Sequence, residues 1–238
     1  MTELIIVAAA LLPPILLFAY ILRRDPQPEP PKWLAKAVAY GVAICVPISL
    51  VEYFINTMLF GPDGEPSTLV GTTLQSFFVA ALPEEGFKLW ALWRLLRRNP
   101  YYDEHFDGIV YAVCIGLGFA AVENVSYLFL YSEQWQQVAI SRALLAVPGH
   151  YAFAVLMGYY YSLYHFVSPT PRVKAYILGV PVVAHGIYDS LALGSSVAPW
   201  LGAIGFFALI YFCVKMHKYC QKKIVAQLQR DSEQPVGV

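Results

Sequence analysis

Long runs of apolar residues, separated by short polar or proline-rich segments, dominate the pattern of this chain. A transmembrane helix needs about 20 predominantly apolar residues, and seven runs approach or exceed that length. They lie at residues 4–22, 36–60, 77–96, 106–130, 141–165, 175–193 and 200–214. A helix satisfies its own backbone hydrogen bonds, as a span in lipid must. The pattern therefore predicts an all-α polytopic membrane protein, a bundle of about seven transmembrane helices.

Polar segments between these runs divide the chain into three parts. Residues 1–35 hold the first span and a proline-rich linker, DPQPEPPK at 25–32, which cannot be helical throughout because proline lacks a backbone N–H. Residues 36–214 form the predicted transmembrane bundle, which carries the candidate chemistry. Residues 215–238 form a polar tail, for which partial disorder is expected.

Composition and charge agree with a membrane protein and indicate its orientation. Hydrophobic residues make up 58% of the chain and charged residues only 13%, which excludes an ordinary soluble domain. Fourteen of the 16 Lys and Arg residues lie in the tail, in the connections after the first, third and fifth spans, or at the span ends that border these connections. The positive-inside rule therefore predicts an N-terminus outside and a C-terminus in the cytoplasm. No basic surface indicates a nucleic-acid partner, and the scattered cysteines form neither a disulfide framework nor a metal motif.

The predicted third span, at 77–96, carries Glu84, Glu85 and Lys88 in its middle. Ionised groups at that depth are expensive, so intramembrane carboxylates are by default candidates for a functional site. On a helix, a lysine three or four residues after a glutamate can pair with it. A purely structural ion pair would have the same spacing, and either glutamate can be the one that faces Lys88.

Further polar residues recur at a similar depth in the other spans. Glu84 and Glu85 lie about 12 Å below the outer end of their span, from the rise of an α-helix. Helical rise places six others near that level: Glu52, Glu123, Asn124, His150, His185 and Asp189. Pro83 and Pro148 are compatible with kinks that open two spans towards a wet cavity. We therefore expect one polar cluster in the outer half of the bilayer, and none below it.

Three chemistries suit carboxylates and histidines that meet in such a cavity. In hydrolysis, a glutamate acts as general base on water while a histidine acts as an acid or stabilises an oxyanion. In a metal site, His150, His185 and a carboxylate bind the ion. In transport, the same groups relay protons or cations. The residues alone leave hydrolase and transporter equally open, whereas a receptor or scaffold predicts that substituting these residues leaves function intact.

Four ordered motifs resemble those of the PrsW-type intramembrane proteases, distant relatives of the CAAX prenyl endopeptidases. They are PEEGFK at 83–88, FDGIVYAVCIGLGFAAVENVSY at 106–127, VPGHYAFAVLMGYY at 147–160 and AHGIYDSL at 184–191. The resemblance covers residues 82–191 and leaves out the first two spans and the tail. It implies an intramembrane endopeptidase that clips a single-span, membrane-anchored protein such as an anti-sigma factor on its extracytoplasmic side. It also implies regulated proteolysis in a bacterial inner (cytoplasmic) membrane.

The same resemblance assigns roles to individual residues. Glu84 and Glu85 would activate water, and His150 and His185 would bind or polarise the reacting groups. Asp189 completes the catalytic set, although the CAAX relatives carry an asparagine at its position. The supporting residues are Lys88, Glu123 and Asn124. The cofactor is either zinc or none, and the ligands of a zinc ion would be His150, His185 and Glu123. The alternatives are a proton- or cation-coupled transporter and a CAAX-type prenyl endopeptidase, for which the chain shows no prenyl-binding signature.

Overall fold

The computed structural model describes residues 2–62 and 64–233, and all regular structure within them is helical. The α-helices there are α1 (Thr2–Leu22), α2 (Pro31–Ala43), α3 (Cys45–Phe60), α4 (Leu69–Leu74), α5 (Leu82–Leu96), α6 (Asp107–Leu130), α7 (Trp135–Ser141), α8 (Val147–Ser162), α9 (Pro171–Val197) and α10 (Gly202–Glu233). Short 3₁₀ turns lie at Ser132–Gln134 and Pro199–Leu201. The predicted all-α fold class is confirmed.

Six helical segments of the described chain are long and apolar enough to cross a membrane. They are Thr2–Leu22, Pro31–Phe60, Asp107–Leu130, Ser132–Val167, Pro171–Val197 and Pro199–Glu233. The predicted span at 77–96 is also helical, but it carries Glu84, Glu85 and Lys88 and is not among these six segments. Its helix begins earlier than predicted, at Leu69, because the Thr68 side chain accepts a hydrogen bond from the Gly71 N–H and caps α4.

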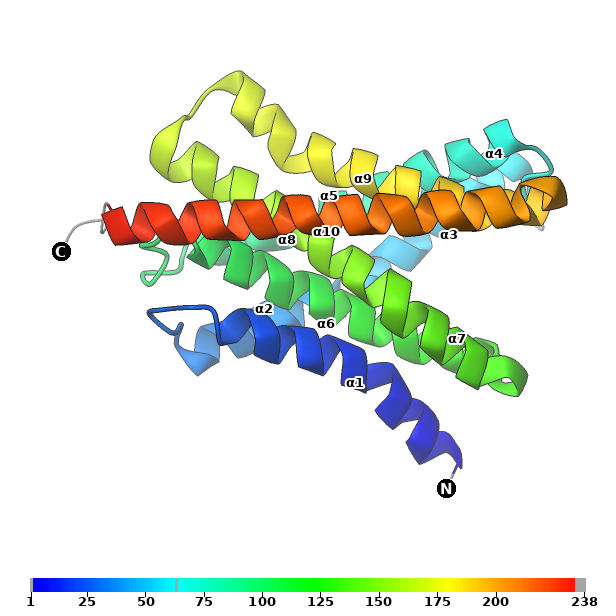
Figure 1. Ribbon diagram of the computed structural model, residues 1–238, viewed down its shortest axis with the longest axis horizontal. Helices are drawn as coiled ribbons and strands as arrows, with labels where there is room; N and C mark the ends of the chain where they lie inside the picture. The colour runs from blue at the N-terminus through cyan, green and yellow to red at the C-terminus, as the bar shows by residue number, and fades with distance from the viewer. Residues whose placement is uncertain (1, 63, 234–238) are drawn as a thin grey trace.

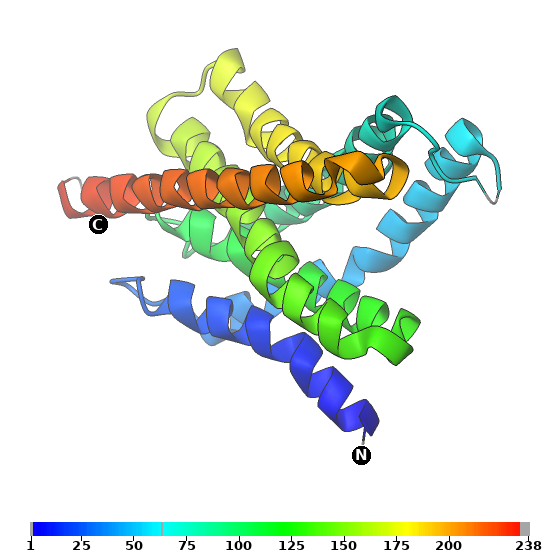
Figure 2. The same cartoon turned by 45° about the vertical axis from the view of Figure 1, so that its right-hand side comes forward.

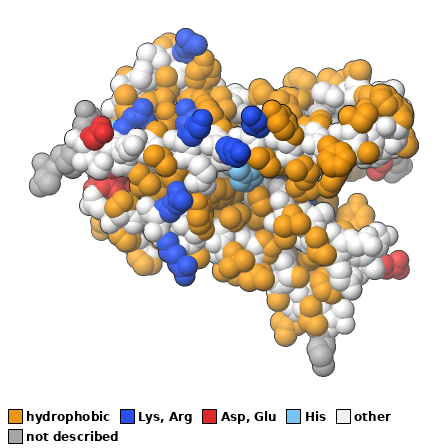
Figure 3. Space-filling model, viewed as in Figure 1, with side chains coloured by type: hydrophobic (Ala, Val, Ile, Leu, Met, Phe, Trp, Pro, Cys, Tyr) orange, Lys and Arg blue, Asp and Glu red, His pale blue; other side chains and the backbone are white. Residues whose placement is uncertain are grey.

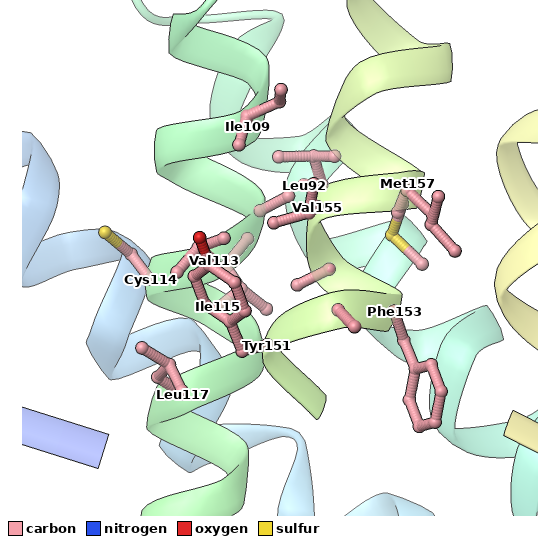
Figure 4. Packing of buried hydrophobic residues seen from close by; sticks show 14 of the residues in the cluster. Leu92, Ile109, Val113, Cys114, Ile115, Leu117, Tyr151, Phe153, Val155 and Met157 are labelled. Carbon is pink, nitrogen blue, oxygen red and sulfur yellow. The ribbon is translucent and has the colours of Figure 1, made fainter. Parts of the chain in front are cut away.

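The centre of the bundle is α6, whose residues from Asp107 to Ala120 are all buried. It packs against α1, α2 and α8, and the views agree on this arrangement (Figures 1 and 2). Figure 4 shows apolar side chains of α6 and α8, together with Leu92 of α5, filling the space between these helices. Gly116 permits the close approach, because a Cβ there would lie 2.9 Å from the Ala154 Cβ. This packing holds α6 close against α8 at the centre of the bundle.

Two π-helical segments precede the prolines that were expected to kink their spans. They are Gln75–Ala81, before Pro83, and Arg142–Ala146, before Pro148. Proline supplies no N–H for the α-helical ladder and its ring crowds the preceding turn. The backbone widens instead, so that the Leu82 N–H donates to the Phe77 carbonyl and the Val147 N–H to the Arg142 carbonyl. Such π-bulges occur frequently at functional sites.

The polar tail, for which partial disorder was expected, is helical from residue 215 to Glu233. α10 continues through the end of the predicted span as far as Glu233, and residues 234–238 lie outside the described part. Cys220 and Ile224 are buried, and the Gln227 side chain donates a hydrogen bond to the Tyr159 carbonyl of α8. The tail is therefore ordered by packing against α8, which its polar composition conceals.

The start of α1 and the end of α10 lie at opposite ends of the bundle (Figure 1). Apolar side chains cover much of the face in Figure 3, as expected for a surface in contact with lipid. Lys and Arg side chains gather on the left and middle of that face, where the carboxyl half of α10 lies. An N-terminus outside the membrane remains a prediction from the charge distribution.

The contact between α6 and α8 depends on Gly158. A Cβ at this position would lie 2.6 Å from the Ile109 Cα and would overlap the Gly108 carbonyl, neither of which can move without shifting α6. We expect Gly158→Ala to lower the free energy of unfolding by about 1–3 kcal/mol, measured by denaturation of the purified protein in detergent. Gly179→Ala in α9 is the matched control, because nothing lies within 4 Å of its Cβ. A control as destabilised as Gly158→Ala would contradict the packing explanation.

Candidate active site

Lys88 joins the two adjacent glutamates at the start of α5. Its Nζ lies 2.8 Å from Glu84 Oε2 and 2.9 Å from Glu85 Oε1. All three residues are buried, and Glu85 is fully so. The predicted pairings of Lys88 with Glu84 and with Glu85 therefore occur together. Lys88 lies one helical turn after the two adjacent glutamates, within reach of both.

Each candidate histidine reaches this triad with one ring nitrogen and a further carboxylate with the other. His150 Nδ1 lies 3.4 Å from Lys88 Nζ, while its Nε2 lies 2.7 Å from Glu123 Oε2. His185 Nδ1 lies 3.1 Å from Glu85 Oε1, and its Nε2 lies 3.2 Å from Asp189 Oδ2. Carboxylates that hold the far nitrogen orient an imidazole and set its tautomer.

A buried arginine at the end of the network nearest α7 extends it further. Arg142 donates from Nη2 to Glu123 Oε2 and from Nε to Asn124 Oδ1, each at a distance of 2.6 Å. The Asn124 amide nitrogen donates to the Ala10 carbonyl of α1 at 3.0 Å. Asn124 is thus engaged on both sides, and it links α1 to the network. The sequence motifs did not single out Arg142, although a lone arginine at the start of the predicted span 141–165 was a usable signal.

Two aromatic rings enclose the polar groups. Lys88 Nζ lies 4.2 Å from the centre of the Phe119 ring, within range of a cation–π interaction. The Phe153 ring stacks on His185 with 4.6 Å between the ring centres. Nothing in the sequence pattern distinguishes these rings from the other aromatic residues of the spans. Glu52, expected at the same depth, forms no ion pair among the described residues.

The eight residues that the resemblance singled out therefore lie in one network, which Arg142 completes. It holds four carboxylates, Glu84, Glu85, Glu123 and Asp189, but only two permanently cationic side chains, Lys88 and Arg142. One further acceptor, Glu85 Oε2, is buried without a hydrogen-bond partner in the described chain. The arrangement suits proton transfer to and from a bound reactant.

One set of donor atoms in the network is compact enough to hold a metal ion. Glu84, Glu85 and His150 each place a donor atom within 4.8 Å of the others. The Lys88 ammonium contacts all three residues and so stands where an ion bound by them would lie. His185 and Glu123 contact members of this set from either side, so a metal set of His150, His185 and Glu123 remains a prediction.

A comparison with models of protein families matches residues 29–216 to the PrsW family of intramembrane metalloproteases. The match covers most of the chain and includes all four motifs. The chain belongs to the PrsW family. It is therefore a peptidase, as the motifs indicated, and a multi-pass membrane protein.

Curated relatives agree with this assignment. The chain is 29% identical to Protease PrsW of Geobacillus kaustophilus over 94% of its own length and 95% of the relative. It is 31% identical to Protease PrsW of Bacillus subtilis over 82% of this chain and 85% of that one. It is 36% identical to Protease PrsW of Clostridioides difficile over 69% of each. No solved structure matches the chain. These relatives are bacterial, in agreement with the predicted inner membrane.

The metalloprotease description of the PrsW family can be tested against the residues present. Two carboxylates and an imidazole are ligands that zinc accepts, and three protein ligands leave a position for water. Glu84, Glu85 and His150 supply this donor chemistry, and the Glu85 oxygen without a partner adds an acceptor. These residues fit a metal ion, provided that the Lys88 ammonium moves aside.

Proposed function

We propose that the chain cleaves a peptide bond of a single-span membrane protein near its extracytoplasmic side, with water activated at the Glu84 and Glu85 pair. The observation that carries the proposal is the closed network around Lys88, in which two adjacent carboxylates meet two imidazoles, each held by another carboxylate. The proposed substrate is a membrane-anchored protein of the anti-sigma-factor kind, cut in regulated proteolysis. The network would equally suit proton relay, but membership of a protease family favours hydrolysis.

In this proposal Glu84 is the general base. Its Oε2 accepts a hydrogen bond from Lys88. Its Oε1 is not a fully buried, unpartnered oxygen like Glu85 Oε2. Glu85 is fully buried and bonds through a single oxygen to both Lys88 and His185, which suits a positioning role. Glu84 therefore has the oxygen that can accept a proton from water. The Lys88 ammonium stabilises the negative charge of the carboxylate pair before the proton is taken.

The histidines would deliver protons and polarise the scissile carbonyl. Glu123 and Asp189 favour a proton on the ring nitrogen that faces each of them. A proton carried by these rings can be donated to the developing oxyanion or to the leaving amine. If zinc is the cofactor, Glu84, Glu85 and His150 would hold it, and it would supply a Lewis acid that polarises the carbonyl and acidifies bound water.

Comparative membrane proteomics tests this function and identifies the substrate in the same experiment. We expect a single-span membrane protein to accumulate uncleaved in cells that carry the Glu84→Gln/Glu85→Gln double variant in place of the wild type. Its new terminus in wild-type cells locates the cleavage site and shows whether it lies near the extracytoplasmic boundary. Cells with Glu133→Gln, which changes an exposed carboxylate after α6, serve as the matched control. Identical membrane proteomes for the wild type and the double variant would refute the proposal.

A further inference from the structure

A second group of carboxylates lies at the opposite end of α6 from the candidate active site. Glu29 belongs to the linker between α1 and α2, Asp103 to the connection between α5 and α6, and Asp107 is the first residue of α6. Both connections lie at the same end of the bundle (Figure 1). One oxygen from each side chain lies within 4.8 Å of the others. Asp107 precedes Glu123 by sixteen helical residues, so the two sites are about 24 Å apart along α6.

Asp107 is fully buried, but only one of its oxygens is satisfied. Its Oδ2 accepts hydrogen bonds from the backbone N–H groups of Asp103 and Glu104, at 3.1 and 2.8 Å. Its Oδ1 has no hydrogen-bond donor in the described chain. The Glu29 and Asp107 carboxyl groups contact each other, and the Tyr111 hydroxyl donates to Glu29. Two carboxylates in contact repel unless a proton or a cation lies between them.

No basic side chain of the described residues balances this charge. Asp25 and Glu104 are also buried beside the group, with 7% and 8% of their surfaces exposed, and each has an oxygen without a partner. Neither residue forms an ion pair within residues 2–62 and 64–233, and His105, the neighbour of Glu104, pairs with Asp231 at 2.6 Å. Burial, reinforced by Asp231, raises the pKa of Asp25 to about 6. The region thus concentrates negative charge without a counter-ion from the protein.

We propose that Glu29, Asp103 and Asp107 form a binding site for a hard divalent cation of the Mg²⁺ or Ca²⁺ class. Carboxylate oxygens without nitrogen or sulfur donors are the ligands that these ions prefer. The unsatisfied Asp107 oxygen and the contact between Glu29 and Asp107 are what a cation would resolve. A bound ion ties the linker between α1 and α2 to the start of α6. It stabilises the end of the bundle that the charge distribution places in the cytoplasm.

Cation binding to the full-length protein in detergent tests this site directly. After treatment with a chelator, we expect the wild type to bind Mn²⁺, used as a paramagnetic probe. In Asp103→Asn, one equivalent of this Mn²⁺ should be lost or should bind about tenfold more weakly, a change of ~1.4 kcal/mol. Asp103 is exposed and its side chain makes no hydrogen bond in the described chain, so this variant should fold normally. Mg²⁺ and Ca²⁺ should compete with the probe. At about 100-fold excess over Kd, either ion should raise Tm by about 5 °C or more.

Two matched variants separate this site from the active site. Glu84→Gln removes a possible metal ligand from the candidate active site, and it should not change the Mn²⁺ that Mg²⁺ and Ca²⁺ displace. Glu133→Gln, at an exposed position, should not change it either. Glu29→Gln should weaken it as Asp103→Asn does. The proposal is overturned if no cation binds, or if Asp103→Asn and Glu29→Gln bind as the wild type does. It is also overturned if acid alone raises Tm with no effect of cations, because Glu29 and Asp107 then share a proton instead.

Discussion

Glu84→Gln is expected to lower kcat for peptide cleavage by about 10²–10⁴-fold, the usual contribution of a general base. Glutamine keeps the shape of the side chain and an oxygen that can accept from Lys88, which lies 2.8 Å away. It removes the basic oxygen that takes the proton from water. The measurement is the rate at which the purified variant, reconstituted in liposomes, cleaves a single-span reporter identified by the proteomic comparison.

Glu85→Gln separates the two adjacent carboxylates. Glu85 is fully buried and bonded to Lys88 and His185, so its loss should disturb the position of His185 more than the supply of a base. We therefore expect Glu85→Gln to lower kcat less than Glu84→Gln does, measured with the same reporter. Glu133→Gln controls for the change of charge. Cleavage by Glu84→Gln at the wild-type rate would exclude Glu84 as the base.

The spans and the membership of the active-site network followed from the sequence because the bilayer restricts both. Only helices satisfy the backbone in lipid, so apolar length predicts the spans. Charged groups are rare at that depth, so Glu84, His150 and Asp189 were conspicuous, and helical rise placed them at one level. The structure joins all three in one network of side-chain contacts. Depth alone could not predict which carboxylate pairs with which histidine. That pairing depends on how each helix is rotated about its own axis.

Features that depend on packing between distant segments could not be predicted in this way. The polar composition of the last residues suggested disorder, yet Gln227 and the buried Cys220 hold α10 against α8. Asp231 accepts the backbone N–H groups of His105 and Phe106 and so satisfies donors at the start of α6. The carboxylates around Asp107 were likewise missed, because three loop and helix-end residues carry no sequence pattern that brings them together.

Lys88→Met is expected to lower the free energy of unfolding by about 3–5 kcal/mol, the usual effect of breaking a buried ion pair from one side. Methionine fills a similar volume, but Glu84 and Glu85 are then left buried beside each other without their shared cation. Denaturation of the purified variant in detergent measures the loss. Lys174→Met, at an exposed position of α9, is the matched control and should change stability little.

The Lys88→Met, Glu84→Gln, Glu85→Gln triple variant shows whether charge is the cause. Removing all members of a buried ionic group is often neutral, so the triple variant should regain most of the stability lost in Lys88→Met. If the triple variant is no more stable than Lys88→Met, lost packing rather than unpaired charge explains the effect.

Lys88→Met also exposes the donor set of Glu84, Glu85 and His150 that the ammonium now contacts. We therefore expect its zinc content, measured by elemental analysis against Lys174→Met, to exceed that of the wild type. An unchanged content would show that displacement of Lys88 is not what limits metal binding at these three residues.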